Sequence, residues 1–302
     1  MAQIIGYCCI NMFLNESKPK VTTNRSMTKK TFLQRGITYA SELALMNSKD
    51  LLPILQWNLN NKIKLFRMSS DMFPWASEYS LQDMPEYRQI KYYLKEAGEF
   101  SLANDIRITT HPGPFNVLGS PNEPAVLNTI SDLELHGEVF DLMGLHRSPY
   151  NKINIHCNGT YGDKQSTMDR FCDNFTNRLS DAVKSRLTLE NDDKGSMYSV
   201  KDLMYIHSKV GIPIVFDYHH HKFCTGGLTE QEAVTLAAST WPSDIIPVVH
   251  YSESKALHES NLKIKPQAHS DYINALPNTY GLKIAIQVEA KAKERAILKF
   301  IY

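Results

Sequence analysis

Six short apolar stretches of this sequence each end on an imidazole or a carboxylate side chain. In chain order these side chains are His111, His156, Glu190, Asp217, His250 and Glu289. Histidine combined with Asp and Glu suits Mn²⁺, Zn²⁺ or Fe²⁺, whereas a site made only of oxygen ligands would suit Mg²⁺ or Ca²⁺. Carboxylates that lie close together repel one another unless a cation offsets their charge. The pattern therefore predicts a site for divalent cations, provided that the fold brings these residues together.

Each of these residues also has an ordinary structural explanation, such as a hydrogen-bonded histidine at the rim of a sheet. Six successive stretches with the same ending favour the metal site over six separate explanations. The sequence has 11 histidines, and we interpret four of them as structural or solvated: His136, His146, His207 and His258. Contiguous histidines cannot all face one metal, and in the run 219–221 the spacing from Asp217 favours His220 as a ligand.

Short apolar runs alternate with longer amphipathic segments along the chain. The runs predicted as strands are 3–10, 64–67, 106–109, 153–156, 187–190, 212–217, 246–250 and 284–289. The segments predicted as helices are 30–60, 85–103, 124–143, 168–185, 200–210, 229–239, 271–275 and 291–301. This alternation indicates βαβ units, and eight of them indicate a closed parallel (β/α)₈ TIM barrel. All strands of such a barrel point their carboxyl ends at one face, so the strand-end residues are expected to meet there.

Length and composition are compatible with a single barrel domain over residues 1–302. Hydrophobic residues make up 42% of the chain and charged residues 22%, which is typical of a globular enzyme. The alternative fold, an open doubly wound sheet, would require a glycine-rich turn after the first strand. The segment Gly6-Tyr7-Cys8-Cys9 is not such a turn.

Charge and cysteine usage narrow the classes of partner. The formal net charge is +1, so any nucleic-acid binding must come from local basic patches. The five cysteines include no CxxC pair and indicate free thiols in a reducing compartment. No apolar stretch approaches the about 20 residues that a bilayer requires, and the run 4–10 is too short for a signal peptide. We therefore expect a soluble cytoplasmic protein with no membrane partner.

Several short motifs occur in a characteristic order along nearly the whole chain. They are Gly6-Tyr7 with Thr22-Thr23-Asn24-Arg25, Leu65-Phe66-Arg67-Met68-Ser69-Ser70-Asp71, Thr110-His111-Pro112-Gly113, Leu189-Glu190-Asn191-Asp192, Asp217-Tyr218-His219-His220, Ala268-His269 and Val288-Glu289-Ala290-Lys291. In this order the motifs resemble the UV damage endonuclease family, which is related to the endonuclease IV and xylose isomerase-like barrels. Each motif alone would be weak, whereas their order at successive strand ends is specific.

This resemblance implies a cluster of two or three divalent ions, with Mn²⁺ favoured and Mg²⁺, Zn²⁺ or Co²⁺ as alternatives. The matching ligand positions are His111, His156, Glu190, Asp217, His220, His250, His269 and Glu289. Four of them are expected to be catalytic: Glu190, Asp217, His250 and Glu289. Glu190 is the best candidate for a bridge between two metals, and His269 rests on the resemblance alone.

Three positions depart from the family pattern. Glu78 stands where a histidine is usual, and we predict it as a further ligand that favours Mn²⁺ or Mg²⁺. Val248 stands where some members carry a carboxylated lysine; because valine cannot ligate, one metal is expected to bind weakly or to use water. Pro114-Phe115 replaces a Gln-Tyr pair that probes damaged bases in other members. Phe115 keeps a ring that could wedge or stack, whereas Pro114 lacks the amide.

DNA contacts are expected in the loops around the mouth of the barrel. The residues predicted to make them are Tyr7, Asn11, Arg25, Pro114, Phe115 and Lys255. Tyr7 matches the family's Gly-Tyr and could stack on an extruded base. Arg25 and Lys255 belong to basic loops after the first and seventh strands, where they could contact phosphates.

The resemblance implies hydrolysis of the DNA phosphodiester 5′ to UV photoproducts, with abasic sites as a further lesion. The partner would be damaged double-stranded DNA, and we expect a monomer without a nucleotide cofactor that associates with the nucleoid when it acts. One alternative is a sugar or sugar-phosphate isomerase, which would have a carboxylate-dominated site and no need for basic loops. The other is a barrel that binds damaged DNA but has lost catalysis through Val248 and Glu78.

Overall fold

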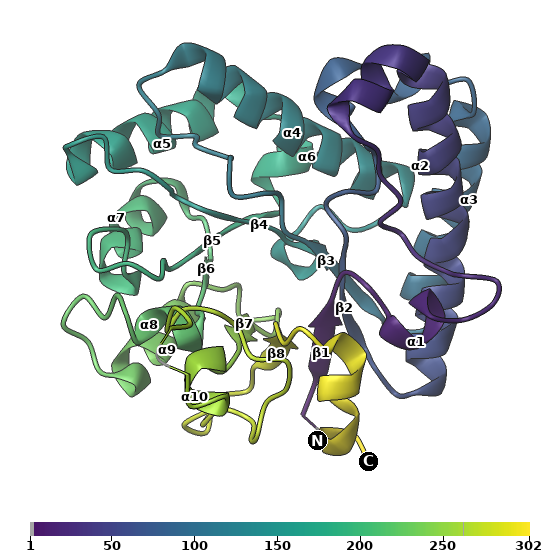
Figure 1. Ribbon diagram of the computed structural model, residues 1–302. Coiled ribbons are helices and arrows are strands. Elements are labelled where there is room, and N and C mark those ends of the chain that lie inside the picture. Colours follow the sequence, from purple (N-terminus) through teal and green to yellow (C-terminus); the bar gives the residue numbers. More distant parts are fainter. Residues whose placement is uncertain (1–2, 262) are drawn as a thin grey trace.

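Eight parallel strands form the centre of the molecule in a computed structural model that describes residues 3–261 and 263–302 (Figure 1). The strands are β1 Ile5–Cys8, β2 Leu65–Met68, β3 Arg107–Thr110, β4 Ile153–His156, β5 Leu187–Glu190, β6 Ile214–Val215, β7 Val248–Tyr251 and β8 Ala285–Val288. They pair in the order β6-β5-β4-β3-β2-β1-β8-β7. A parallel bridge between Asp217 and His250, just beyond β6 and within β7, joins the two edges. The predicted (β/α)₈ barrel is therefore confirmed.

Helices follow the strands and surround them on the outside (Figure 1). The α-helices are α1 Met12–Asn15, α2 Lys29–Asn60, α3 Tyr87–Ala103, α4 Glu123–Leu142, α5 Lys164–Arg178, α6 Asp181–Lys184, α7 Val200–Val210, α8 Tyr218–His221, α9 Glu230–Ser239 and α10 Lys255–His258. The 3₁₀ segments are η1 Ala76–Glu78, η2 Leu81–Asp83, η3 Pro149–Asn151, η4 Lys293–Ala296 and η5 Leu298–Phe300. None of the helices in the described residues combines the length and apolarity needed to cross a bilayer.

The strands have almost no exposed residues because one face packs on the helices and the other fills the barrel. Apolar side chains such as Ile108, Ile155 and Leu189 belong to the large core between strands and helices. A separate small cluster closes the end of the barrel at which the strands begin, with Leu65, Val215 and Val248 among its members. Polar side chains occupy the interior above this cluster, towards the carboxyl ends of the strands.

Two predicted helices differ in the structure. Residues 271–275 form no helix, because the amides of Asn274 and Ala275 donate to the Glu253 carboxylate instead of to a helical carbonyl. The last predicted helix, 291–301, is present only as η4 and η5, and Lys293 has a positive φ of 57° that is incompatible with an α-helix at that point.

Two further differences lie in the lengths of elements. The sixth strand is shorter than predicted because Asp217 caps the short helix α8, accepting a hydrogen bond from the His220 amide. The predicted helix 168–185 is two helices, α5 and α6, because Leu179 between them is extended.

Candidate metal centre

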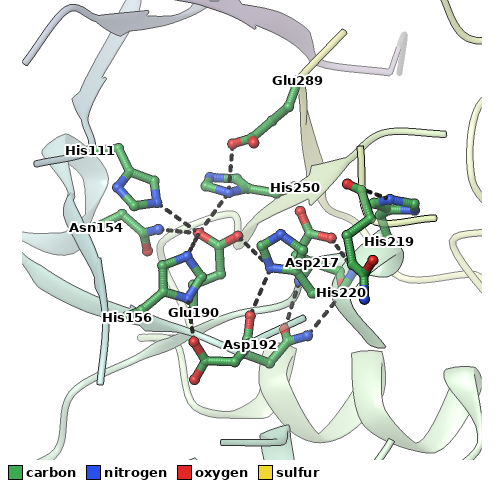
Figure 2. A network of polar contacts seen from close by, with 12 residues as sticks. His111, Asn154, His156, Glu190, Asp192, Asp217, His219, His220, His250 and Glu289 are labelled. Carbon is green, nitrogen blue, oxygen red and sulfur yellow. Dashed lines mark hydrogen bonds and ion pairs between the residues drawn. The ribbon is translucent and has the colours of Figure 1, made fainter. Parts of the chain in front are cut away.

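The carboxyl ends of the strands bring the predicted ligands to one place. His156 on β4 is the register partner of Glu190 on β5, and Asp217 bridges His250. Figure 2 shows that these side chains turn towards one another, with Glu190 in the middle of the network. Residues as far apart in the chain as His111 and Glu289 therefore share one cluster.

Glu190 is fully buried and is the central carboxylate of the cluster. Its nearest imidazole nitrogens are His250 Nδ1 at 2.9 Å, His111 Nε2 at 3.1 Å, His220 Nδ1 at 3.3 Å and His156 Nε2 at 3.8 Å. Asn154 donates to Oε2 from its side-chain amide at 2.5 Å, and Thr188 orients that amide by donating to its oxygen at 2.8 Å. A carboxylate with this surrounding is held in one orientation.

A second carboxylate lies on the other side of His250. His250 Nδ1 is 3.1 Å from Glu289 Oε1, so one ring nitrogen is shared between Glu190 and Glu289. Arg67, from β2, makes an ion pair with Glu289 inside the barrel. The other ring nitrogen of His250, Nε2, lies 3.0 Å from the Nζ of the fully buried Lys152. His250 therefore has a polar partner on each of its two nitrogens.

The titration behaviour of the cluster reflects its excess of carboxylates. Burial raises the pKa of Glu190, but His250 and His156 outweigh burial, and the pKa lies well below its usual range. Burial would lower the pKa of His156, yet Glu190, together with Asp192 and Asp217, raises it to about 10. Burial lowers the pKa of His111 to about 4, so this imidazole is neutral and has a free lone pair. The proton retained on His156 offsets part of the negative charge of the carboxylates. A bound divalent cation would offset the same charge.

The donor atoms also fit a group of metal ions. Three sets of side chains each place their ligand atoms within 4.8 Å of one another: His111, Glu190 and His250; His156, Glu190 and His220; Asp217, His250 and Glu289. Glu190 and His250 each belong to two sets. Glu190 Oε1 and Asp217 Oδ2 are buried without a hydrogen-bond partner among the described residues, as expected for oxygens that face a cation.

A comparison with known families is consistent with this geometry. The family model described as UV-endonuclease UvdE matches residues 3–302. The chain belongs to the UV-endonuclease UvdE family. The resemblance that the motifs indicated is thereby confirmed.

Curated UvdE relatives match along nearly the entire chain. The UV-damage endonuclease of Schizosaccharomyces pombe is 35% identical over 304 residues, which cover 98% of this chain and 49% of the relative. The UV DNA damage endonuclease of Bacillus cereus (strain Q1) is 31% identical over 319 residues, which cover 100% of this chain and 94% of the relative. The chain spans about half the length of the relatives from S. pombe and Neurospora crassa.

Solved structures agree with the UvdE assignment. The crystal structure of SacUVDE superposes with a TM-score of 0.84 at 29% identity and covers 99% of this chain and 96% of its own. Endonuclease IV from Thermus thermophilus (TM-score 0.53, 11% identity, 94% and 92% covered) and a D-psicose 3-epimerase from Clostridium cellulolyticum (TM-score 0.52, 12% identity, 80% and 79% covered) share the barrel. At such identities the likeness shows the fold alone.

Two ligand positions inferred from the UvdE resemblance have different outcomes. His269 lies at the edge of the cluster, where its Nδ1 is 3.7 Å from Glu289 Oε2, although it belongs to none of the three sets. Glu78 is exposed on η1, which packs against α4, and none of the sets found among residues 3–261 and 263–302 includes it. No contact in the described residues links Glu78 to the cluster, so its role as a ligand stays a prediction.

Two predicted DNA contacts, Tyr7 and Asn11, are contradicted by their burial. Tyr7 points from β1 to α2 and is fully buried; its hydroxyl donates to Asn58 at 2.8 Å and its ring packs against Phe66. Asn11 is 1% exposed, caps α1 and donates to the Tyr7 hydroxyl at 3.1 Å. Neither side chain can reach a base without breaking this buried network.

The other predicted contacts are on the surface or partly so. Pro114 and Phe115 are exposed in the loop after β3, and the Phe115 side chain is 88% accessible. Arg25 is held by Asp50 at 2.6 Å and by the Thr22 carbonyl, so its charge already has partners. The Nζ of Lys255 lies 3.3 Å from Glu259 Oε1 and 3.4 Å from Asp271 Oδ1. Their contacts with phosphate stay predictions.

Sequence reasoning missed the polar residues that support the cluster from inside the barrel. Asn154 lies on β4 and Lys152 directly before it, two and four residues ahead of His156, and Arg67 lies on β2. Successive side chains of a strand face opposite sides, so positions two and four before a strand-end ligand share its side. That alternation was the signal that could have identified Asn154 and Lys152.

Proposed function

We propose that this protein is a metal-dependent endonuclease that hydrolyses the DNA phosphodiester 5′ to UV photoproducts, with abasic sites as a further substrate. The observation that carries the proposal is the four imidazoles within 3.8 Å of the buried Glu190 carboxylate at the barrel mouth. Membership of the UvdE family supports DNA as the substrate.

The residues that would hold the ions are those of the three sets, with His269 at their edge. We expect two or three divalent ions, with Mn²⁺ preferred because the donors mix imidazole and carboxylate. When bound, such ions lower the pKa of water from about 15.7 towards 7 and polarise a phosphate.

The chain's own residues prepare the site for that chemistry. Asn154 fixes the orientation of Glu190, and Arg67 compensates the charge of Glu289 without lying on the surface. His111 is neutral at physiological pH because burial lowers its pKa to about 4, so it can ligate without first losing a proton. The buried position of these groups limits the water that could compete with the phosphate.

Damaged double-stranded DNA would approach from the carboxyl ends of the strands, where the cluster opens. Phe115 is the most exposed large apolar side chain of the described residues and follows the ligand His111 by four positions. It is suited to contact an unstacked base. In this proposal the protein acts as a cytoplasmic monomer and uses no nucleotide cofactor.

The test is a nicking assay on defined duplex oligonucleotides that carry one pyrimidine dimer, one 6-4 photoproduct or one abasic site. We expect incision immediately 5′ to the photoproducts after chelated protein is supplied with Mn²⁺, and none of the undamaged duplex. Protein that carries Mn²⁺ but leaves all three lesions uncut would overturn the proposal. Conversion of a sugar or sugar phosphate by the same preparation would instead indicate the isomerase alternative.

A further inference from the structure

One asparagine joins the two loops that follow the ligands His111 and His156. Asn158 Nδ2 donates to the Asn116 carbonyl at 2.9 Å and lies 3.3 Å from the Pro114 carbonyl. These carbonyls belong to the residues on either side of Phe115. A single side-chain amide therefore holds the backbone on both sides of the exposed ring.

The base of the Phe115 loop is rigid for a separate reason. The Asn116 side chain is 4% exposed and donates to the Gly113 carbonyl at 2.9 Å and to Asp132 on α4 at 2.8 Å. The Val117 amide donates to the Thr129 hydroxyl at 2.9 Å. Phe115 therefore projects from a fixed loop, although its own side chain has few contacts.

A second exposed aromatic ring, Tyr161, stands on the loop that carries Asn158. Its side chain is 44% exposed, and its backbone is left-handed with φ of 46°. The ring lies over Gly159, where a Cβ would come within 2.7 Å of the ring atoms. Only glycine leaves room for the ring in this place.

The backbone beneath Tyr161 is also anchored. The Tyr198 hydroxyl donates to the Gly159 carbonyl at 2.8 Å, and the Thr167 hydroxyl donates to the Thr160 carbonyl at 3.0 Å. Left-handed, non-glycine residues such as Asn158 and Tyr161 persist where the surroundings fix them, and they concentrate at functional sites.

The two rings belong to the loops that follow neighbouring ligands of the cluster, His111 on one side and His156 on the other. The rings of His111 and His156 are 5.5 Å apart, and the loops that leave them are the ones Asn158 joins. We propose that Phe115 and Tyr161 together form a two-ring contact for the bases of damaged duplex DNA, and that Asn158 is the positioning residue that fixes their spacing. This inference rests on the proposed nuclease function and names a DNA-contacting surface of the same site.

The occupant follows from continuity with the cluster. Bases present an aromatic face that stacks on Phe and Tyr rings whatever their sequence. A duplex whose phosphate lies at the cluster would bring its neighbouring bases to these two loops. Unstacking a base beside a lesion costs less free energy than unstacking a base in an intact pair. Two exposed rings that stack on such a base therefore favour damaged duplex over intact duplex.

The experiment measures binding of a duplex with one abasic-site analogue by fluorescence anisotropy in EDTA, and nicking of the same duplex in Mn²⁺. Tyr161→Asn removes the ring and keeps a residue that tolerates a left-handed backbone. We expect it to raise the dissociation constant about 10-fold, since stacking on one aromatic side chain has an effect of this order. Tyr161→Phe keeps the ring and should bind within twofold of wild type. Tyr92→Asn, on the outer face of α3, is the matched control and should have no effect.

Asn158→Asp is nearly isosteric but turns an acceptor towards two carbonyls, so the loops should separate. Phe115→Trp provides a fluorescent reporter of that role. We expect the damaged duplex to quench the tryptophan fluorescence of this variant. In the double variant that also carries Asn158→Asp, most of this quenching should be lost. A merely structural role would change the unfolding midpoint and leave the quenching intact. That outcome would overturn the role of Asn158.

The outcomes separate this inference from the nuclease proposal. If wild-type protein nicks the lesion while Tyr161→Asn binds and nicks within twofold of it, the two-ring contact is wrong and the nuclease proposal stands. If wild-type protein does not bind this duplex and nicks none of the three lesions, both are wrong. Folding of each variant is checked by its unfolding midpoint, and Tyr161→Phe restores binding only if the ring itself makes the contact.

Discussion

Glu190→Gln is expected to lower the rate of nicking by roughly 10³-fold or more, a loss of the size seen when a central charge-stabilising group is removed from an active site. Glu190 belongs to two of the three candidate ligand sets and is the only carboxylate shared between them. The amide of glutamine has one oxygen and carries no charge, so it cannot serve two ions as a carboxylate does. The measurement is the nicking rate on the duplex with a pyrimidine dimer at saturating Mn²⁺.

The matched control for this substitution is Glu134→Gln. Glu134 lies on α4, outside the barrel, where it accepts hydrogen bonds from the Ser180 amide and hydroxyl at 2.7 and 2.6 Å. We expect wild-type nicking from this variant, and a folded circular dichroism spectrum from both. Full activity of a folded Glu190→Gln protein would contradict the role assigned to the cluster.

Removal of divalent metal is expected to abolish nicking and to lower the thermal stability of the protein. Three buried or nearly buried carboxylates, Glu190, Asp217 and Glu289, face one another across His250. Ions bound only to the folded state should add about 2.7 kcal/mol to the free energy of unfolding at a free concentration 100 times the dissociation constant. For a protein of this class such an increase shifts the unfolding midpoint upward by several degrees.

Scanning calorimetry of chelated protein, with and without Mn²⁺, measures this shift. In Glu190→Gln the shift should be clearly smaller, because two ligand sets lose the same oxygen donor. An equal shift in both proteins would mean that the stabilising ion binds elsewhere. The absence of any shift in wild-type protein would count against a metal cluster.

Convergence of the ligands could be predicted because it depends on one general rule of parallel barrels. Polar endings such as His156 and Glu190 are visible in the sequence, and the barrel directs all strand ends to one face. The specific contacts between these residues could not be predicted. The register that pairs His156 with Glu190, and the bridge between Asp217 and His250, depend on how the strands stagger in three dimensions.

The direction in which a side chain points was the main source of error in predicting the DNA contacts. Tyr7 lies at the correct place in the chain, yet it points to Asn58 on α2 rather than to the mouth. A motif shared with a family identifies a residue without fixing the side of the strand from which it projects. Burying the Tyr7 hydroxyl also requires a partner, and two asparagines far apart in the sequence, Asn58 and Asn11, supply it.

Helix prediction from the local sequence was wrong where backbone amides donate to groups distant in the sequence instead of to helical carbonyls. Residues 271–275 are predicted as a short helix, but the Glu253 carboxylate accepts hydrogen bonds from two of their amides. In the same region the Lys291 amide donates to the Ser270 carbonyl, which ties the residues after His269 to the end of β8. Such long-range partners cannot be read from the segment's own residues.

The most direct test of the central claim is anomalous scattering from crystals of the protein prepared with Mn²⁺. We expect two or three anomalous peaks at the barrel mouth, each within ligand distance of Glu190 or of the Asp217, His250 and Glu289 set. Fully metal-loaded protein whose peaks lie only outside this cluster would contradict it.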